Sequence, residues 1–161
     1  MHAHTRNAAS PLSLNALPPP AVVSWLGFAG LIPFAAPLLL GLFEPTLTPR
    51  LLHAQQLYGA VILSFLGAIH WGLAMVMPEI ESGRQRVLFI WSVVPSLIGW
   101  LACLLGGMEG SLLLSFGLLV QYACDVYQMR CGGVPAWYLR LRFRLTTLAV
   151  LSLLAGAWLL A

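Results

Sequence analysis

The chain has 161 residues, of which 60% are hydrophobic and 8% charged, and eight arginines against five acidic residues give it a formal net charge of +3. Soluble domains carry roughly a quarter of charged residues, and a soluble domain of this length cannot bury so much apolar surface, so the excess must face lipid. The positive charge is too small and too scattered for nucleic acid. The composition therefore predicts an integral membrane protein whose first partner is the lipid bilayer.

Residues 1–21 are rich in proline, serine and alanine and carry three consecutive prolines near their end. This composition predicts a disordered tail ahead of a single domain that spans 22–161. The tail lacks the n-region and cleavage site of a signal peptide, and the apolar run after it is too long for an h-region. Because it has one arginine and no acidic residue, a mitochondrial presequence is left open.

Five apolar runs follow, and each approaches or exceeds the ~20 residues that span a hydrocarbon core. They lie at 22–43, 57–77, 87–106, 111–129 and 143–161. The connections at 44–56, 78–86, 107–110 and 130–138 contain the glycines and prolines that end one helix and start the next. The pattern predicts an all-α, polytopic membrane protein built as a bundle of five transmembrane helices.

Three prolines fall inside these runs, Pro33 and Pro37 in the first and Pro95 in the third. Each removes a backbone hydrogen bond, so each predicts a bend that neighbouring helices must accommodate. Transporters use such breaks at binding sites, but proline is also common in membrane helices that only pack.

The arginines are distributed unequally between the two sides of the predicted bundle. With five spans, one side carries Arg6, Arg84, Arg86, Arg130, Arg140, Arg142 and Arg144, whereas the other carries only Arg50. Under the positive-inside rule this asymmetry predicts a cytoplasmic N-terminus and a C-terminus on the far side.

Aromatic and basic residues meet just before the last run. Trp137 and Tyr138 are expected at the membrane interface, with Arg140, Arg142 and Arg144 reaching to the lipid headgroups. An anionic-lipid site is one reading of this cluster, but ordinary topology signalling explains the arginines better.

Polar residues in three of the runs fall at one depth. His70 lies 13 residues from Leu57 and Asp125 lies 14 residues from Ser111, which places both about 20 Å from the same face. Gln121 is one turn from Asp125, and the third run brings two serines to a similar layer. The sequence therefore predicts a buried polar cluster made of His70, Gln121, Asp125, Ser92 and Ser96.

Three roles are compatible with this cluster. It can form structural hydrogen bonds that fix helix register, line a proton or solute path, or hold a cofactor such as haem. A haem with two histidine ligands would need a second histidine at depth, and His2, His4 and His53 fall in the tail or a connection. Two copies of His70 could meet in a homo-oligomer, but nothing in the sequence requires one.

Catalytic and metal-binding patterns are missing from the sequence. It has no GxSxG, HExxH, P-loop or GxGxxG motif, so we expect no enzyme. Cys103, Cys124 and Cys131 have no CxxC spacing and are expected to be small hydrophobic residues, so we expect no metal site and no cofactor.

Four blocks of the sequence occur in an order that carries a family resemblance. They are LGFAGLIPF at 26–34, YGAVILSFLGAIHWG at 58–72, WSVVPS at 91–96 and PAWYLRLR at 135–142. The chain resembles the bacterial family named domain of unknown function three-four-two-nine. That family also includes an animal mitochondrial protein, number sixty-nine in the transmembrane-protein series. The resemblance implies a small multi-pass protein of the bacterial or mitochondrial inner membrane, with no established activity to carry over.

Three functions are expected from these observations together. The first is a non-catalytic accessory, scaffold or assembly protein of the energy-transducing membrane, bound to membrane-protein partners or to lipid. The second is a small carrier or proton-linked channel that uses His70, Gln121 and Asp125. The third is a holder for a redox cofactor, either haem or quinone.

Overall fold

The computed structural model describes residues 20–76, 82–130 and 136–159. Within these ranges the elements are α1 (Ala21–Ala29), α2 (Ile32–Phe43), the 3-10 helix η2 (Pro45–Leu47), α3 (Thr48–Val76), α4 (Ser82–Leu105), α5 (Gly107–Arg130) and α6 (Ala136–Leu159). Five stretches are long and apolar enough to cross a membrane, and α1 with α2 forms the first. The predicted all-α architecture with five spans is confirmed. Residues 1–19 of the expected tail lie outside the described residues.

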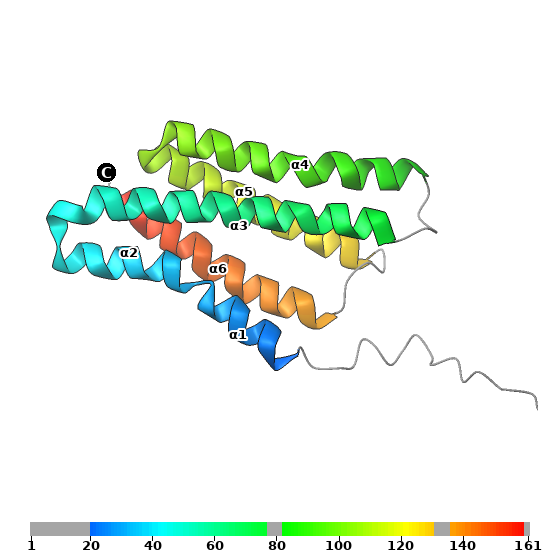
Figure 1. The fold of residues 1–161 in the computed structure, drawn as a ribbon, viewed down its shortest axis with the longest axis horizontal. Helices are drawn as coiled ribbons and strands as arrows, with labels where there is room; N and C mark the ends of the chain where they lie inside the picture. The colour runs from blue at the N-terminus through cyan, green and yellow to red at the C-terminus, as the bar shows by residue number, and fades with distance from the viewer. Residues whose placement is uncertain (1–19, 77–81, 131–135, 160–161) are drawn as a thin grey trace, which may run out of the picture.

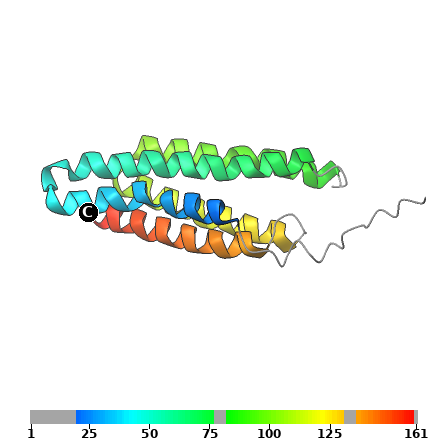
Figure 2. The same ribbon diagram turned by 60° about the horizontal axis from the view of Figure 1, so that its bottom comes forward.

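The spans run side by side along the long axis of the molecule (Figure 1). Figure 2 shows α3 and α4 next to each other, with α6 and the first span on the other side of the bundle. α3 is the central helix, because it packs against α2, α4, α5 and α6. α5 packs against both α4 and α6 and completes the bundle.

All but one of the described arginines gather at one end of the bundle, where α3 and α5 end and α1, α4 and α6 begin (Figure 1). We call it the arginine-rich end; its residues include Arg84, Arg86, Arg140, Arg142 and Arg144. Arg50 lies at the opposite end, near the start of α3. This grouping agrees with the arginine asymmetry of the sequence, and the cytoplasmic location of this end stays a prediction.

The first span is broken into two helices at Gly30 and Leu31. Pro33 lacks the N–H that would bond to the carbonyl of Ala29, so the helix cannot continue regularly through this point. The carbonyl of Gly30 accepts a hydrogen bond from Oη of Tyr58 at 3.0 Å, which ties the break to α3. α1 is therefore a short helix of its own, and none of its residues is buried.

The second span begins earlier than hydropathy predicts. Residues 44–56 were expected to form a connection, yet α3 starts at Thr48 with Pro49 in its first turn, where proline is favoured. The helix continues through Gln55 and Gln56, which are buried inside the bundle and hydrogen-bonded to other helices. Buried, hydrogen-bonded glutamines lower the local hydropathy in the same way as loop residues do. This is why the sequence predicted a connection where the structure has the first turns of α3.

Two other boundaries shift for related reasons. The turn expected at 107–110 is tighter, because Gly106 and Gly107 have φ angles of 62° and 49° and α5 starts within them. α6 begins at Ala136 rather than at residue 143, so its first two turns contain the arginines expected to precede it. This early start decides how those arginines are oriented.

A close crossing of α3 and α4 positions the candidate site. A Cβ atom on Gly67 would lie 2.6 Å from the carbonyl oxygen of Ser92 and 3.0 Å from Cγ of Pro95. Only glycine permits this approach, so Gly67 brings Trp91 and His70 within reach of the same residue on α5.

Candidate functional site

A buried polar cluster joins α3, α4, α5 and α6 toward the arginine-rich end. His70, Gln121, Asp125 and Arg142 are each at most 6% exposed. The structure brings the predicted residues His70, Gln121 and Asp125 together. Arg142 joins them from α6.

Gln121 is the hub of the buried polar cluster. Its Oε1 accepts a hydrogen bond from Nε1 of Trp91 at 3.1 Å, and since an indole N–H can only donate, this contact fixes the orientation of the amide. Its Nε2 lies 3.1 Å from Nδ1 of His70 and 3.3 Å from the carbonyl oxygen of Leu66. Gln121 Nε2 donates to His70 Nδ1, so a neutral imidazole carries its proton on Nε2.

Asp125 and Arg142 form a buried ion pair between α5 and α6. Nε of Arg142 donates to Oδ2 of Asp125 at 3.0 Å. The second carboxylate oxygen, Oδ1, lies 3.4 Å from Nε2 of Gln121 and 3.7 Å from Nε2 of His70. Within the described residues His70 Nε2 has no hydrogen-bond partner. The cluster therefore holds two opposite charges and one unused imidazole nitrogen.

Arg142 corrects the expectation that all three arginines of α6 reach to the lipid headgroups. Arg140 and Arg144 are exposed, whereas Arg142 is buried. Residues two positions apart on a helix point about 200° apart, so Arg140 and Arg144 share one face and Arg142 takes the opposite one. This alternation, together with the need of buried Asp125 for a counter-charge, is the signal that could have identified Arg142.

The two predicted serines lie outside the cluster. Oγ of Ser92 donates to the carbonyl of Phe89 in its own helix at 2.7 Å. Across the described ranges, neither Ser92 nor Ser96 makes a hydrogen bond to the cluster. The contact from α4 to the cluster is made instead by Trp91, which the sequence analysis did not identify and which donates a hydrogen bond to Gln121.

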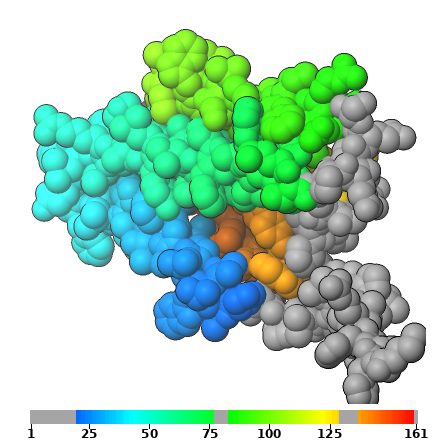
Figure 3. Space-filling view, turned by 45° about the vertical axis from the view of Figure 1, so that its right-hand side comes forward, coloured from blue at the N-terminus to red at the C-terminus, as the bar shows by residue number. Residues whose placement is uncertain are grey.

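A lateral groove lies beside the cluster, between the first span and the rest of the bundle. Its volume is about 370 Å³ and its walls are mostly apolar. It is lined by Val23, Leu26, Gly27, Gly30, Leu31, Phe34, Tyr58, Ile62, Phe65, Leu66, Ile69, Leu118, Tyr138, Leu141, Arg142, Leu145, Thr146 and Ala149. Figure 3 shows it as a hollow between α1 in blue and α3 in green, with α6 in orange at its floor.

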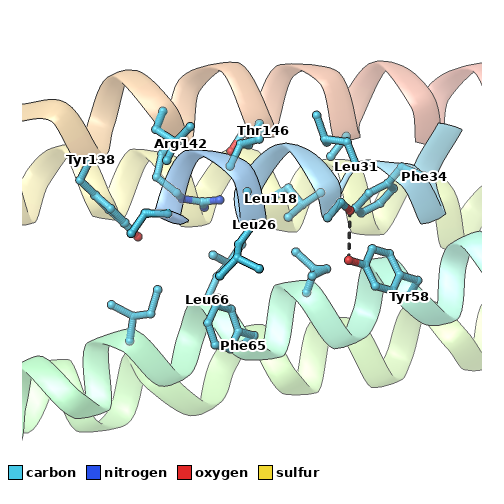
Figure 4. A pocket seen from close by; sticks show the side chains of 18 residues that line it. Leu26, Leu31, Phe34, Tyr58, Phe65, Leu66, Leu118, Tyr138, Arg142 and Thr146 are labelled. Atoms are coloured by element: carbon cyan, nitrogen blue, oxygen red, sulfur yellow. Dashed lines mark hydrogen bonds between the residues drawn. The ribbon is translucent and has the colours of Figure 1, made fainter. Parts of the chain in front are cut away.

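Three polar side chains of α6 follow one another along this groove. Tyr138, Arg142 and Thr146 are spaced by four residues, so they share one face of the helix (Figure 4). Oη of Tyr138, Nη2 of Arg142 and Oγ1 of Thr146 are buried. Oη of Tyr138 lies close to Arg142 and Asp125, whereas Nη2 of Arg142 and Oγ1 of Thr146 have no hydrogen-bond partner among the described residues. Arg142 thus connects the buried polar cluster, through Nε, with the groove, through Nη2. Trp137, expected beside Tyr138 at the interface, is half-buried.

A second polar layer, which the sequence did not predict, lies toward the opposite end. We call it the amide clamp; it consists of Gln55, Gln56, Ser111 and Ser152. Nε2 of Gln55 donates to the carbonyl of Phe34 at 2.7 Å and to Oγ of Ser152 at 3.0 Å, and Oγ of Ser152 donates to the same carbonyl at 2.7 Å. Nε2 of Gln56 donates to Oγ of Ser111 at 2.7 Å and to the carbonyl of Gly107.

The histidines, cysteines and acidic residues of the described part of the chain are spread over the bundle. No group of three or more His, Cys, Asp and Glu residues gathers there. His53 lies 17 residues before His70 on the same helix, which is about 25 Å away. The described histidines of one copy therefore do not face each other across a haem.

Comparison with known proteins places the chain among membrane proteins. The model of a family described as "Protein of unknown function (DUF3429)" matches residues 19–158. Transmembrane protein 69 of Xenopus tropicalis is 38% identical over 148 residues, which is 89% of this chain and 56% of that protein. Transmembrane protein 69 of Mus musculus is 33% identical over 138 residues, or 84% and 54%. The chain thus spans about half the length of these relatives. No solved structure matches it significantly.

Proposed function

The chain belongs to the DUF3429 family, and we propose that it is a non-catalytic accessory protein of the energy-transducing membrane that holds an apolar partner in the lateral groove. The observation that carries this proposal is the groove itself. It is apolar, it opens between α1 and α3 on the lipid-facing side, and one wall is a helix with no buried residue. A surface of this kind suits a partner that arrives from within the bilayer.

The packing of α1 supports a holding role. A Cβ atom on Gly27 would lie 3.0 Å from Cδ1 of Leu145 on α6, so α1 and α6 approach closely at this one point. Around it, Trp25 and Leu26 are 78% and 69% exposed, which leaves α1 weakly anchored. A short helix held mainly at one glycine can adjust its distance from the bundle to the size of an occupant.

The choice of membrane rests on the family resemblance and not on geometry. A family found both in bacteria and in mitochondria is expected in the membrane that the two have in common, which is the energy-transducing one. The accessory part of the proposal is supported by the five stretches that are long and apolar enough to cross a membrane, because they contain most of the described residues.

Co-purification in a mild detergent tests this function with a matched pair of glycine variants. Gly27→Leu places a side chain where α1 meets α6, whereas Gly72→Leu places the same side chain on α3 where nothing lies within 4 Å. We expect mass spectrometry to find the same proteins and lipids with the wild type and Gly72→Leu, and to find them depleted with Gly27→Leu. An identical set for all three would contradict the proposal.

A second candidate function, a small proton-linked carrier, is favoured by one observation. His70 Nε2 has no hydrogen-bond partner in the described ranges and lies beside Asp125, whose partner Arg142 reaches the groove. A carrier of this kind would make proteoliposomes leak protons or solute, and His70→Gln would abolish the flux. If proteoliposomes with the wild-type protein leak no more protons or solute than empty vesicles, the carrier alternative is wrong and the accessory function is unaffected.

A further inference from the structure

Resting on the proposed role of the lateral groove, we propose that its occupant is a single-chain membrane lipid with a neutral carbonyl head, of the quinone class. Its carbonyl oxygen accepts hydrogen bonds from Arg142 and Thr146, and its chain lies along α6. Binding alone is proposed, with no electron transfer.

The first argument is the set of unused hydrogen-bonding groups. Arg142 and Thr146 are 6% and 3% exposed, and the buried atoms Nη2 and Oγ1 have no partner among the described residues. Buried polar groups are nearly always hydrogen-bonded, so two orphans on one face of one helix indicate a missing partner. A guanidinium can only donate and the hydroxyl of Thr146 can donate, so the missing partner must offer an acceptor oxygen.

The second argument is charge. Arg142 is already neutralised by Asp125, with Nε and Oδ2 3.0 Å apart. An anionic head in the groove would add an uncompensated negative charge to a buried site, which is strongly unfavourable. A neutral carbonyl accepts the same hydrogen bonds without that penalty, which favours a ketone or quinone over a carboxylate.

The third argument is shape. The groove follows α6 from Tyr138 to Ala149, 11 residues or about 16 Å, and its volume of about 370 Å³ falls in the range of small-molecule pockets. The polar side chains of α6 occupy the stretch from Tyr138 to Thr146, and the rest of the wall is aliphatic and aromatic apart from Tyr58, whose hydroxyl is bonded to Gly30 (Figure 4). This space suits one ring followed by part of one chain, and it is too small for the two acyl chains of a bilayer phospholipid.

The fourth argument is depth and access. Arg142 is six residues from the start of α6, which places it about 9 Å along the helix axis from Ala136 and inside the apolar span that starts at Trp137. The groove opens sideways toward lipid (Figure 3), so the occupant enters from the hydrocarbon region. Membrane quinones combine these features, because they are neutral, carry carbonyl oxygens and have a single apolar chain.

Titration of the purified full chain in detergent with decylubiquinone tests the proposal, with decanoate and decanol as probes of the same chain length. Binding is measured as the ligand-dependent rise in unfolding temperature, from which Kd is obtained. We expect decylubiquinone to bind more tightly than either control. Equally tight binding of decanoate would overturn the neutral head, and equally tight binding of decanol would overturn the carbonyl.

A matched pair of variants locates the site. Thr146→Val removes an unused hydroxyl, whereas Thr147→Val removes a hydroxyl from its exposed neighbour. We expect Thr146→Val to weaken decylubiquinone binding roughly threefold to tenfold, the effect of one hydrogen bond, and Thr147→Val to leave it unchanged. Unchanged binding in Thr146→Val would overturn the site.

These measurements separate the ligand from the proposed function. If decylubiquinone fails to bind while Gly27→Leu still releases the co-purifying partners, the quinone-class ligand is wrong and the accessory role stands. If decylubiquinone binds as expected while Gly27→Leu releases nothing, the ligand stands and the accessory role is wrong.

Discussion

The two polar layers of this bundle use similar residue types in opposite ways. The amide clamp contains only neutral amides and hydroxyls, and they bond to one another and to backbone carbonyls of α2 and α5. The buried polar cluster contains an ion pair and a histidine, and three polar atoms in it or beside it stay unused, namely Nε2 of His70, Nη2 of Arg142 and Oγ1 of Thr146. Among the described atoms of the clamp, Oε1 of Gln55 alone is buried without a partner.

The difference indicates which layer serves the fold and which serves a ligand. A polar layer that only fixes helix register gains most when every group is satisfied, because unmet donors cost about 1–3 kcal/mol each. In the amide clamp nearly every described polar group is hydrogen-bonded. Around Arg142 the unmet groups gather where a groove opens to lipid, so the comparison points to the groove as the functional region.

The largest effect in this comparison is expected from Arg142→Met. The change leaves Asp125 as an unpaired buried charge, so we expect the free energy of unfolding to fall by about 3–5 kcal/mol. Unfolding in mixed detergent, followed by circular dichroism, measures it. Arg140→Met removes an exposed arginine two residues away and is expected to change stability by about 0.5 kcal/mol or less. Equal losses in the two variants would mean that Arg142 is not paired.

A smaller loss is expected from Gln121→Met, which removes the hub of the cluster but no charge. The indole N–H of Trp91 and Nδ1 of His70 both lose their partner, which corresponds to about 2–3 kcal/mol. The same unfolding measurement applies. A loss no larger than that of the clamp variant below would contradict the central place of Gln121.

Gln55→Met in the clamp is expected to cost less, about 1–2 kcal/mol. The carbonyl of Phe34 keeps a donor, because Oγ of Ser152 also bonds to it. We further expect decylubiquinone binding to be unchanged, since the clamp does not line the groove. A variant that stays folded but loses binding would show that the two layers are not independent.

Much of the fold could be predicted from hydropathy and depth. The five spans follow from apolar runs of membrane length, and the meeting of His70 with Gln121 and Asp125 follows from counting residues along two helices, α3 and α5, that run in the same direction. Both arguments need only the helical rise and the direction of each span. Helix ends were predicted less well, because Gln55 and Gln56 are polar yet buried.

The rest depends on rotation and tilt, which hydropathy does not encode. The spacing of Arg140, Arg142 and Arg144 on a helix indicates that Arg142 faces away from the other two and can be buried. The positive-inside rule does not use this spacing, because it counts all three arginines alike. Trp91 and Ser92 are adjacent, and only the crossing at Gly67 decides which of them faces α5. The groove depends on how α1 leaves the break at Gly30, which no local pattern specifies.

The most direct test removes one hydroxyl from the amide clamp and one from the groove beside the buried polar cluster, and compares the free energies of unfolding in the same detergent without added ligand. Ser152→Ala removes a hydroxyl that donates to Phe34 and accepts from Gln55, so a loss of about 1–2 kcal/mol is expected. Thr146→Val removes a buried hydroxyl without a partner in the described chain, so stability should stay unchanged or rise by up to about 1 kcal/mol. If Thr146→Val destabilised the protein as much as Ser152→Ala, the hydroxyl of Thr146 would already be bonded, and the contrast between the two layers would be wrong.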